Sequence, residues 1–401
     1  MSFRPFLIDA FRCAVAAVEA ARATERATPS LELGATPVLV LALGKAAPGM
    51  ARGFCAAHPG PVRGLVVAAE PEPIPPSLDL MIGDHPVPSA RSLAAGEALL
   101  RAASSARDDE TVVALISGGG SALAEALVPG VDLEDLRTQT AALLLSGRPI
   151  DDLNAVRTAV SRLKGGGLAA AAGGHRVVTL AISDVIGDRP EVIASGPTVA
   201  SDASERAMKV VAGVGAIPKA IQTAVGRGAV NARSSGRSFT VVASRHDAAG
   251  AAAAHLRSGA WAVSVVAEPI SGEAARLAPR LVAAAHPDTA TVYSGETTVT
   301  VRGSGRGGRN QEAALAAALA IDGNEDAGFL AAGTDGIDGM TDAAGAVVDG
   351  GTAAEGRAAG LDPAAMLADN DSGRFFEQVS GRLVTDRTGT NVGDIWIVAR
   401  R

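Results

Sequence analysis

The sequence predicts an α/β protein with a Rossmann-like parallel-sheet N-terminal domain and a smaller α/β C-terminal domain with a mixed sheet. From about Pro37 to Val199, short apolar runs alternate with Gly-containing turns and helical stretches, as in βαβ units. These runs are nearly continuous, which is typical of parallel strands buried on both faces. Further along, Thr297–Arg302 alternates apolar and polar residues, which predicts a half-exposed strand of a mixed sheet.

The elements follow in order along the chain. Apolar residues from Leu7 to Ala21 recur at helical spacing and predict an amphipathic N-terminal helix. The clearest strands of the parallel sheet are expected at Val38–Leu43, Leu65–Ala69, Thr111–Ile116 and Val177–Ile182. Helices of the second domain are expected at Ala248–Ser258, Gly272–Ala285 and Asn310–Ile321. The polar stretch Asn231–Arg237 separates the two parts, so we expect domains at residues 1–236 and 237–401.

Composition limits the classes of function. The 401 residues are 47% hydrophobic with a net charge of −7, and no basic run is present, which disfavours nucleic acid as a partner. No stretch of about 18 apolar residues and no signal-peptide core occurs. Cys13 and Cys55 form neither a disulfide framework nor a zinc set. We therefore expect a cytoplasmic protein that binds small molecules and no membrane, and the sequence leaves a monomer and a homodimer open.

Lys45 directly follows a predicted buried strand and Gly44. Ligands of parallel sheets bind beyond the carboxyl ends of the strands, so this position would aim an ammonium group into that crevice. The segment is not a Walker A sequence. A solvated lysine on a β–α turn explains the local pattern equally well.

Three glycines stand between the strand Thr111–Ile116 and the helix after it, in Ser117-Gly118-Gly119-Gly120-Ser121. Successive glycines let backbone N–H groups converge on an anion at a helix N-terminus. A tight turn that needs positive φ is the alternative, but such a turn rarely requires three glycines. The segment favours phosphate binding.

The segment Asn154–Lys164 is predicted to form a helix that ends at three glycines. Arg157, Ser161 and Lys164 would then share one face, and the two cations could clamp a carboxylate or a phosphate. A solvated face that complements the helix C-terminus is slightly favoured by the sequence alone.

Asp184 and Asp188 follow the strand Val177–Ile182. A carboxylate at this edge can bind Mg²⁺ or take a hydroxyl proton, whereas two carboxylates in a turn can equally be formers of Asx turns. His85, which stands beside a proline, is more often a structural residue.

Gly303, Gly305 and Gly308 satisfy the G-x-G-x-x-G dinucleotide fingerprint and taken literally indicate an NAD(P) oxidoreductase. The preceding strand alternates polar residues, and Arg309–Glu312 would place polar side chains where that helix should pack on a sheet. The fingerprint is therefore weak. Arg309 at a helix N-terminus suits a phosphate or carboxylate instead.

A further polar turn holds Asp335, Asp338 and Asp342. Their spacing and the lack of a closing glutamate exclude an EF-hand. Contact with a Mg²⁺–nucleotide and several capping roles remain comparable alternatives.

Together these segments resemble the glycerate 2-kinase family that carries a MOFRL domain, whose members are also labelled hydroxypyruvate reductase. The resemblance covers nearly the whole chain. It rests on ordered matches at Gly44–Ala46, Gly83–Pro86, Ser117–Ser121, Asn154–Arg157, Lys164–Gly166, Ser183–Asp188, Ser195–Thr198, Gly308–Glu312, Thr334–Gly336 and Thr341–Gly345.

The resemblance implies two α/β domains that flank a cleft, with catalytic residues at Lys45, Asp184 and Arg309. The chain departs from the family pattern at Gly167, Ile337 and Met340.

On this basis we expect ATP-dependent phosphorylation of D-glycerate to 2-phosphoglycerate with Mg²⁺. Phosphates would lie on the backbone of Ser117–Ser121, Asp335 would contact the Mg²⁺–nucleotide, and Mg²⁺ would lie near Asp184 or Asp188. The residues expected to bind glycerate are Arg157, Lys164 and Asn310. The rival functions are an NAD(P)H-dependent hydroxypyruvate reductase and a non-catalytic nucleotide-binding regulator.

Overall fold

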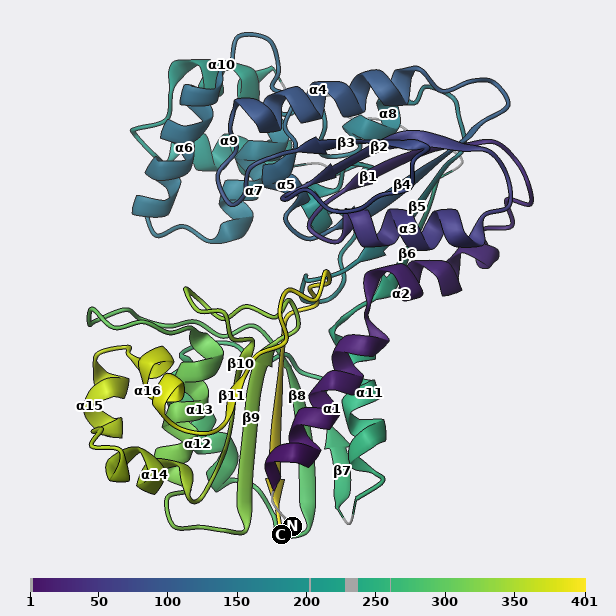
Figure 1. Cartoon of the computed structure of the whole chain (residues 1–401). Coiled ribbons are helices and arrows are strands. Elements are labelled where there is room, and N and C mark those ends of the chain that lie inside the picture. The colour runs from purple at the N-terminus through teal and green to yellow at the C-terminus, as the bar shows by residue number, and fades with distance from the viewer. Residues whose placement is uncertain (1–2, 202, 228–236, 260) are drawn as a thin grey trace. The chain divides into compact units, whose positions relative to one another are not determined.

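The computed structural model describes residues 3–201, 203–227, 237–259 and 261–401 (Figure 1). The chain divides into two compact units: unit 1 holds residues 1–19 and 243–401, and unit 2 holds residues 20–242. This division differs from the expected one because the N-terminal helix α1 (Phe3–Ala17) packs on α11 (Arg245–Leu256) and not on the parallel sheet. Most of the expected linker Asn231–Arg237 lies outside the described residues.

Unit 2 is built on a six-stranded sheet, and every strand pair whose register is described is parallel. Its strand order β3-β2-β1-β4-β5-β6 is that of the dinucleotide-binding fold and reverses direction between β1 and β4. The predicted Rossmann-like sheet is therefore confirmed. The strands are β1 (Val38–Leu43), β2 (Val62–Ala68), β3 (Leu78–Ile82), β4 (Thr111–Ser117), β5 (Val177–Ile182) and β6 (Arg237–Ala243).

Helices cover both faces of this sheet. α4 (Ala90–Ser104) and α8 (Gly167–Ala171) lie on one face and α3 (Ala47–Ala57) on the other (Figure 1). The core between α4 and the sheet is apolar and includes Leu39, Leu41 and Leu99. The other helices of unit 2 are α2 (Ala20–Ala27) and the single-turn α5 (Gly120–Leu123).

A group of four helices in unit 2 has an apolar core of its own, which includes Leu136, Val156 and Ile221. The group consists of α6 (Leu133–Leu145), α7 (Ile150–Ala159), α9 (Ser204–Ala212) and α10 (Lys219–Gly226). Since α7 ends at Ala159, the predicted helix through Lys164 is wrong at its C-terminal end. Val160 and Arg162 pair instead with the extended segment 126–128, where Val128 N donates to Val160 O (3.0 Å) and Arg162 N to Ala126 O (2.7 Å).

Unit 1 is built on a mixed sheet, as predicted, and its strand order is β11-β10-β9-β12-β8-β7. Only the β7–β8 pair is parallel among the pairs with a described register. The strands are β7 (Ala262–Val265), β8 (Thr289–Gly295), β9 (Ala327–Gly333), β10 (Gly345–Asp349), β11 (Arg382–Leu383) and β12 (Asp394–Arg400).

The helices of unit 1 again cover two faces of its sheet. α1 and α11 lie on one face (Figure 1). The other carries α12 (Ala274–Ala283), α13 (Arg309–Ala320), α14 (Thr352–Ala358), α15 (Pro363–Ala368) and α16 (Ser372–Gln378). The three helices predicted for the second domain are confirmed, whereas the predicted N-terminal helix ends at Ala17, before Ala21.

The predicted strand Thr297–Arg302 is wrong. Thr298 makes an isolated bridge with Glu273, and the rest of the segment is irregular. The reason lies in a distant loop, because Asn370 Oδ1 accepts the backbone N–H groups of Arg302 (2.7 Å) and Gly303 (3.1 Å) that a neighbouring strand would otherwise bind.

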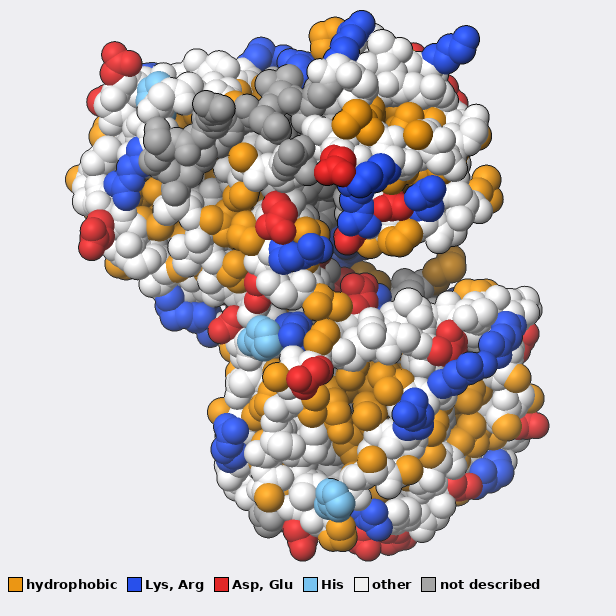
Figure 2. Space-filling view, turned by 180° about the vertical axis from the view of Figure 1, so that it is seen from behind, with side chains coloured by type: hydrophobic (Ala, Val, Ile, Leu, Met, Phe, Trp, Pro, Cys, Tyr) orange, Lys and Arg blue, Asp and Glu red, His pale blue; other side chains and the backbone are white. Residues whose placement is uncertain are grey.

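The two chain ends lie side by side in unit 1 (Figure 1), where the Arg401 guanidinium stands 4.8 Å from the centre of the Phe3 ring. Acidic and basic side chains are interspersed on the face of the molecule that Figure 2 shows. No helix among the described residues is both long enough and apolar enough to cross a bilayer.

Candidate active site

Three predicted segments follow strands that are neighbours in the sheet of unit 2: Lys45 follows β1, the turn Ser117–Ser121 follows β4, and Asp184 follows β5. The carboxyl ends of parallel strands meet at one edge, and the strand order reverses between β1 and β4. The sheet therefore brings these three predicted segments together at its topological switch point, where this fold class binds ligands.

The turn after β1 and the turn after β4 are tied to each other. Lys45 N donates to Gly118 O (3.0 Å), and Ala46 N donates to Ser117 Oγ (3.0 Å). Gly44 has φ +132°, and a Cβ there would stand 2.2 Å from Ser117 Oγ. Only glycine allows this approach, so the position of Lys45 depends on Gly44.

Polar and charged side chains lie against the glycine turn. A Cβ on Gly118 would stand 1.9 Å from Asp184 Oδ2, so the carboxylate lies directly against this glycine. A Cβ on Gly119 would stand 3.0 Å from Lys45 Cγ and 3.3 Å from His85 Cδ2. Because the glycines of the turn have no side chains, Asp184, Lys45 and His85 can lie against it.

The backbone of the glycine turn offers donors. None of the N–H groups of Gly118, Gly119, Gly120 and Ser121 donates to an acceptor among the residues that the structure describes. Gly118 and Gly120 are buried, and a buried N–H without a partner is costly unless a ligand or water accepts it. The following helix α5 is one turn long, so its dipole is weaker than the sequence suggested.

Positive charge surrounds the turn. Burial and the neighbouring charges of Lys45 and Arg157 lower the pKa of His85 to about 4, so its imidazole is neutral at pH 7. Arg157 is buried, and its Nη2 donates to Ser121 O (3.3 Å) while its Nε has no described partner. Burial lowers the pKa of Arg157, opposed by the charge of Glu125. The site therefore presents cations and donors, as an anion requires.

Lys164 differs from its expected role. Its ammonium group forms a buried ion pair with Glu125, and the two side chains are 1% and 0% exposed. Ser161 Oγ also donates to Glu125 (2.5 Å). Burial, opposed by the charge of Glu125, lowers the pKa of Lys164 to about 8. An ammonium group held in this way faces no solvent, which conflicts with the expectation that it grips a substrate carboxylate.

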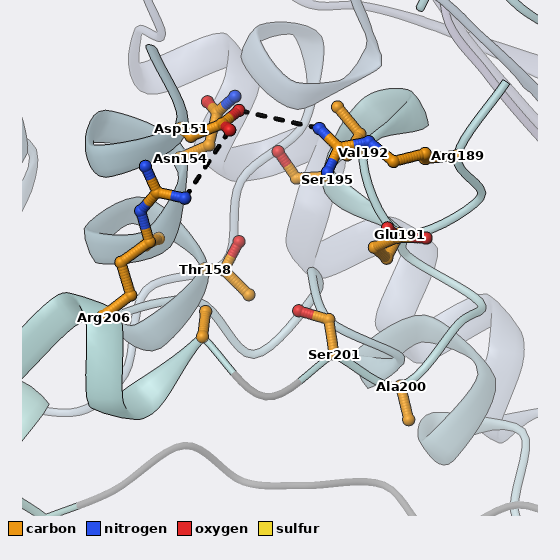
Figure 3. Close-up of a pocket in the computed structure, with 12 residues that line it drawn as sticks. Asp151, Asn154, Thr158, Arg189, Glu191, Val192, Ser195, Ala200, Ser201 and Arg206 are labelled. Atoms are coloured by element: carbon orange, nitrogen blue, oxygen red, sulfur yellow. Dashed lines mark ion pairs between the residues drawn. The ribbon is translucent and has the colours of Figure 1, made fainter. Parts of the chain in front are cut away.

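A pocket of about 440 Å³ lies between α7, α9 and residues on both sides of Thr198. Asn154 and Thr158 line it from α7, and Ser195 lines it from the opposite side (Figure 3). Ser195 Oγ is 2.9 Å from Ser121 Oγ, which links the pocket to the turn. Asp151 forms ion pairs with Arg189 (3.8 Å) and Arg206 (3.6 Å) across it (Figure 3).

The backbone beside this pocket is strained. Ala194 and Ser195 have φ of +50° and +62°, values that non-glycine residues rarely adopt. Gly165 N donates to Ser195 O (3.0 Å) and Gly166 N to Gly196 O (2.7 Å), and these bonds hold the strained segment. Backbone strain of this kind is common at ligand sites.

The carboxylates predicted to bind Mg²⁺ can be tested against the geometry. Asp184 lies against Gly118, while Asp188 has φ +51° in the next turn and its N donates to Val185 O (3.0 Å). No cluster of three or more His, Cys, Asp or Glu side chains suited to a metal occurs in the described part of the chain. Mg²⁺ often binds one or two carboxylates plus substrate phosphates, and Asp184 beside the turn fits that mode.

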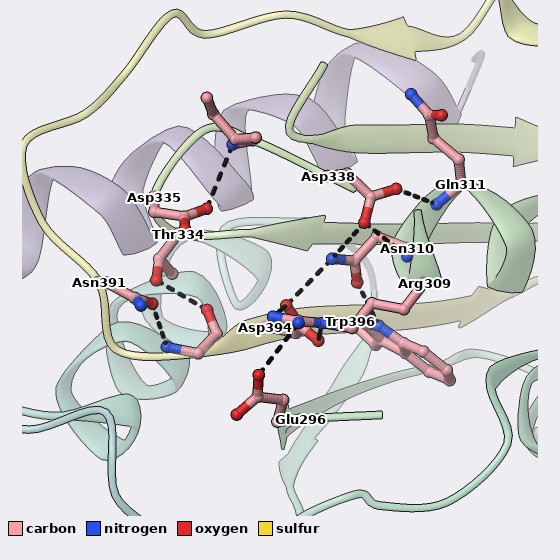
Figure 4. Close-up of polar contacts among 12 residues, drawn as sticks. Glu296, Arg309, Asn310, Gln311, Thr334, Asp335, Asp338, Asn391, Asp394 and Trp396 are labelled. Atoms are coloured by element: carbon pink, nitrogen blue, oxygen red, sulfur yellow. Dashed lines mark hydrogen bonds and ion pairs between the residues drawn. The ribbon is translucent and has the colours of Figure 1, made fainter. Parts of the chain in front are cut away.

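Arg309 is the centre of a polar network in unit 1 (Figure 4). Its Nε and Nη2 donate to Asp394 (2.6 and 2.9 Å), and its Nη1 pairs with Glu296 (3.0 Å). Burial lowers the pKa of Arg309, but the hydrogen bonds and charge of Asp394 together with the charge of Glu296 outweigh it and raise the pKa above its usual value. Arg309 therefore stays protonated.

Asn310 is fully buried in the same network, which conflicts with its expected contact with substrate. Its amide nitrogen donates to Asp394 (3.0 Å), and its amide oxygen accepts the Trp396 indole N–H (2.8 Å) (Figure 4). The amide therefore orients Asp394, and no exposed polar atom remains for a ligand.

The acidic turn after β9 mainly caps other backbone. Asp338 accepts the N–H groups of Asn310 (3.0 Å) and Gln311 (2.8 Å) at the start of α13 (Figure 4). Burial, opposed by these two bonds, raises the pKa of Asp338 to about 7. Asp335 Oδ1 accepts Ile337 N (3.2 Å), so it forms an Asx turn. Its contact with a nucleotide stays a prediction.

The first four residues of the fingerprint Gly303–Gly308 are bound by protein groups. Their N–H groups donate to the loop Asp369–Asp371: Ser304 N to Asp369 Oδ1 (3.1 Å), Gly305 N to Asp369 O (3.0 Å) and Arg306 N to Asp371 Oδ1 (2.8 Å). A pyrophosphate would need these donors. The segment is thus an internal loop contact.

Sequence reasoning missed three carboxylates that organise these sites. Glu125 is a single charge in an apolar segment, a pattern that indicates a paired, buried carboxylate. Asp394 is the first residue of the apolar strand β12, and Glu296 immediately follows β8. For Asp394 and Glu296, the position at or beside a strand end was the available signal. Arg309, the common partner of these two carboxylates, could not be identified from it.

Comparison with known proteins places this geometry in a class. Residues 6–226 match the family described as a domain of unknown function (DUF4147), and residues 289–394 match the MOFRL family. The crystal structure of a glycerate kinase from Thermotoga maritima superposes with a TM-score of 0.92 at 33% identity, covering 99% of both chains. The fold is therefore that of a glycerate kinase.

Sequence relatives make the assignment more specific. The D-glycerate 2-kinase of Thermotoga maritima is 35% identical over 99% of this chain and 98% of its own length. The glycerate kinase of Macaca fascicularis is 35% identical over 79% of this chain and 95% of its own length. The chain belongs to the glycerate 2-kinase family.

Proposed function

We propose that this protein is an ATP-dependent glycerate 2-kinase, which transfers the γ-phosphoryl group of ATP to the 2-hydroxyl of D-glycerate and releases ADP. One observation carries the proposal most strongly. Four consecutive backbone N–H groups, Gly118 to Ser121, find no acceptor among the described residues at the switch point of a Rossmann-like sheet. Phosphate oxygens are acceptors of the number and charge that these donors require.

The side chains around the turn have roles that follow from their charge. Phosphoryl transfer needs positioning and neutralisation of charge on the transferred group. Lys45, which lies along Gly119, supplies an ammonium group there. Buried Arg157 would attract the glycerate carboxylate or a phosphate, since Glu125 is already paired with Lys164. The role of Arg309 in stabilising charge on the transferred group stays a prediction.

Asp184 has two duties in this proposal. Its carboxylate lies against Gly118, so it would hold Mg²⁺ that is bound to the nucleotide phosphates, and Asp188 is the second candidate. Bound Mg²⁺ neutralises the phosphate charge. Asp184 would also orient the attacking hydroxyl and accept its proton. Neutral His85 adds no charge beside the turn.

Two other functions remain to be tested against this one. A relative from Agrobacterium vitis, 35% identical over 98% of this chain and 94% of its own length, carries an unproven hydroxypyruvate reductase name. The first four residues of the dinucleotide fingerprint that would support a reductase donate instead to Asp369–Asp371. A nucleotide-binding regulator would use the same turn without turnover.

The test incubates the purified full-length protein with D-glycerate, ATP and Mg²⁺, and follows ADP release and the position of the product phosphate. A parallel assay contains hydroxypyruvate and NAD(P)H. ADP release with 2-phosphoglycerate is expected. Nicotinamide oxidation without ADP release would replace the proposal with the reductase, and ATP binding without turnover would leave only a regulator.

A further inference from the structure

Arg309 divides its guanidinium group between two carboxylates of different character (Figure 4). Asp394 takes Nε and Nη2 at 2.6 and 2.9 Å, and its side chain is 0% exposed. Glu296 takes Nη1 at 3.0 Å, and its side chain is 58% exposed. One edge of the guanidinium group therefore faces a buried partner, and the other faces a solvated one.

The ion pair between Arg309 and Asp394 is held in place by buried neighbours. Asn310 donates to Asp394 Oδ1 (3.0 Å), and Trp396 in turn donates to Asn310 Oδ1 (2.8 Å), so the carboxylate is fixed from behind (Figure 4). Removal of one member of a buried ion pair leaves an uncompensated charge and costs several kcal/mol. No ligand is expected to replace Asp394, and only the Nη1 edge of Arg309 remains for one.

The Glu296 contact is weak by comparison. The backbone of Glu296 is fixed, because its N–H donates to Ile270 O (3.0 Å) directly after β8. Its side chain, however, is mostly in solvent, where ion pairs contribute little because water and salt screen them. A ligand anion that reaches Arg309 can displace this carboxylate at small cost.

We propose that Glu296 is an internal stand-in for a ligand anion: it occupies the Nη1 edge of Arg309 until a small carboxylate or phosphate group displaces it. Glu296 is then a determinant of affinity, since each anion must compete with it. The proposed function is needed only to identify that anion as part of glycerate or of the transferred phosphate.

The experiment titrates inorganic phosphate into the full-length protein at constant ionic strength and follows tryptophan fluorescence and thermal unfolding. Both tryptophans, Trp261 and Trp396, belong to unit 1, which also holds Arg309. The variant Glu296→Gln should bind phosphate about two- to five-fold more tightly, the gain expected when an exposed ion pair no longer competes. Unchanged phosphate affinity would overturn the proposal.

A matched control separates competition from net charge. Glu325 is exposed and precedes β9, whereas Glu296 follows β8. The two residues therefore lie at opposite ends of the strands, about 20 Å apart for a seven-residue strand. This distance exceeds the Debye length of about 8 Å at physiological salt. Glu325→Gln should leave phosphate affinity unchanged, and an equal gain in both variants would overturn the proposal.

A second background tests the partner. Lysine at position 309 can pair with Asp394 as a point charge but cannot hold two carboxylates on separate edges. In the Arg309→Lys background, Glu296→Gln should therefore lose most of its effect on phosphate affinity, and an undiminished effect would overturn the proposal. Tighter phosphate binding without ADP release would refute only the proposed kinase function. Normal ADP release with unchanged phosphate affinity would refute only the role of Glu296.

Discussion

Each unit of the molecule contains a glycine-rich polar segment, and the two segments differ in what their backbone binds. In unit 2, the N–H groups of Gly118–Ser121 have no acceptor among the described residues. In unit 1, the N–H groups of the first four residues of Gly303–Gly308 donate to the loop Asp369–Asp371. Glycine spacing alone does not distinguish the two cases. Whether such a segment binds a ligand depends on whether a distant loop already fills it.

The charged residues show the same contrast. In unit 2, Arg157 keeps an unpartnered buried Nε beside the glycine turn. In unit 1, Arg309 is bound by Asp394 and Glu296. Unit 2 therefore offers unused donors to an anion, whereas unit 1 must exchange one of its own carboxylates for it. The following experiments test this contrast.

The largest effect is expected at Lys45. Lys45→Met should lower kcat for glycerate phosphorylation by about three to four orders of magnitude, since an ammonium group that neutralises transferred phosphoryl charge is lost. Circular dichroism and thermal unfolding should stay unchanged, because the side chain is only partly buried. Lys209→Met is the matched control, as its ammonium group pairs with Glu205 on the exposed face of α9. A Lys45 variant with near-full turnover would remove this residue from the mechanism.

The buried ion pair of unit 2 should give the next largest effect. Lys164→Met leaves Glu125 charged and unpaired in the core, which should lower the free energy of unfolding by about 3 kcal/mol or more. Chemical denaturation followed by circular dichroism measures this loss. The double variant Glu125→Gln with Lys164→Met should recover part of it. Stability unaffected by the single change would show that Lys164 is not needed to compensate Glu125.

Alanine at one glycine of each segment tests the comparison directly. In unit 1, a Cβ on Gly305 would stand 2.4 Å from Asp371 Cβ, so Gly305→Ala should cost about 2 kcal/mol of stability by overpacking, with the KM for ATP unchanged. In unit 2, Gly119 has φ +82°, and Gly119→Ala should mainly raise the KM for ATP, by about tenfold. Denaturation monitored by tryptophan fluorescence and steady-state kinetics measure the two effects. A raised KM for ATP in Gly305→Ala together with a loss of stability alone in Gly119→Ala would contradict the contrast between the two units.

A more gradual effect is an opposite dependence of stability on pH, with a slope of at most about 1.4 kcal/mol per pH unit for buried Asp338 and a smaller slope for His85, which is exposed and therefore screened by water. The raised pKa of Asp338, about 7, means that its contribution is present below pH 4 and lost as pH rises toward 7. The lowered pKa of His85, about 4, means that its contribution is present above pH 6.5 and lost as pH falls toward 4.

Two spectroscopic signals can separate these trends. Trp261, Trp396 and Tyr293 all lie in unit 1, so fluorescence reports unit 1 and circular dichroism reports both units. The variants Asp338→Asn and His85→Gln should each remove one trend. Persistence of the fluorescence-detected trend in Asp338→Asn would assign it to another group.

The sequence predicted unit 2 well because its signals are local. Strands such as Val38–Leu43 are continuous apolar runs, and the residue that follows each strand must lie at the ligand-binding edge of a parallel sheet. The position of Lys45 beside the glycine turn follows from this rule and from the strand order. The pairing of Glu125 was not predicted because its partner Lys164 is 39 residues further along the chain.

Unit 1 was harder to predict because its polar residues find partners from distant segments. The alternation in Thr297–Arg302 resembles a strand, but the segment binds Asn370. Arg309 was located at the start of its helix, while Asp394, 85 residues away, was not identified as its partner. Polar pairs across such separations leave no periodic pattern, so their geometry had to come from the folded chain.

The position of α1 has a consequence for synthesis on the ribosome. Phe3 stacks with Trp261, and Arg4 binds Asp349 (2.7 Å), yet both partners emerge only after all of unit 2 has been made. Unit 2 is one continuous segment and can complete its sheet first, since domains generally fold as units in the order of synthesis. The apolar face of α1 must wait exposed throughout. Although α1 precedes unit 2 in the chain, it is thus buried against its partners in unit 1 only after unit 2 has been made.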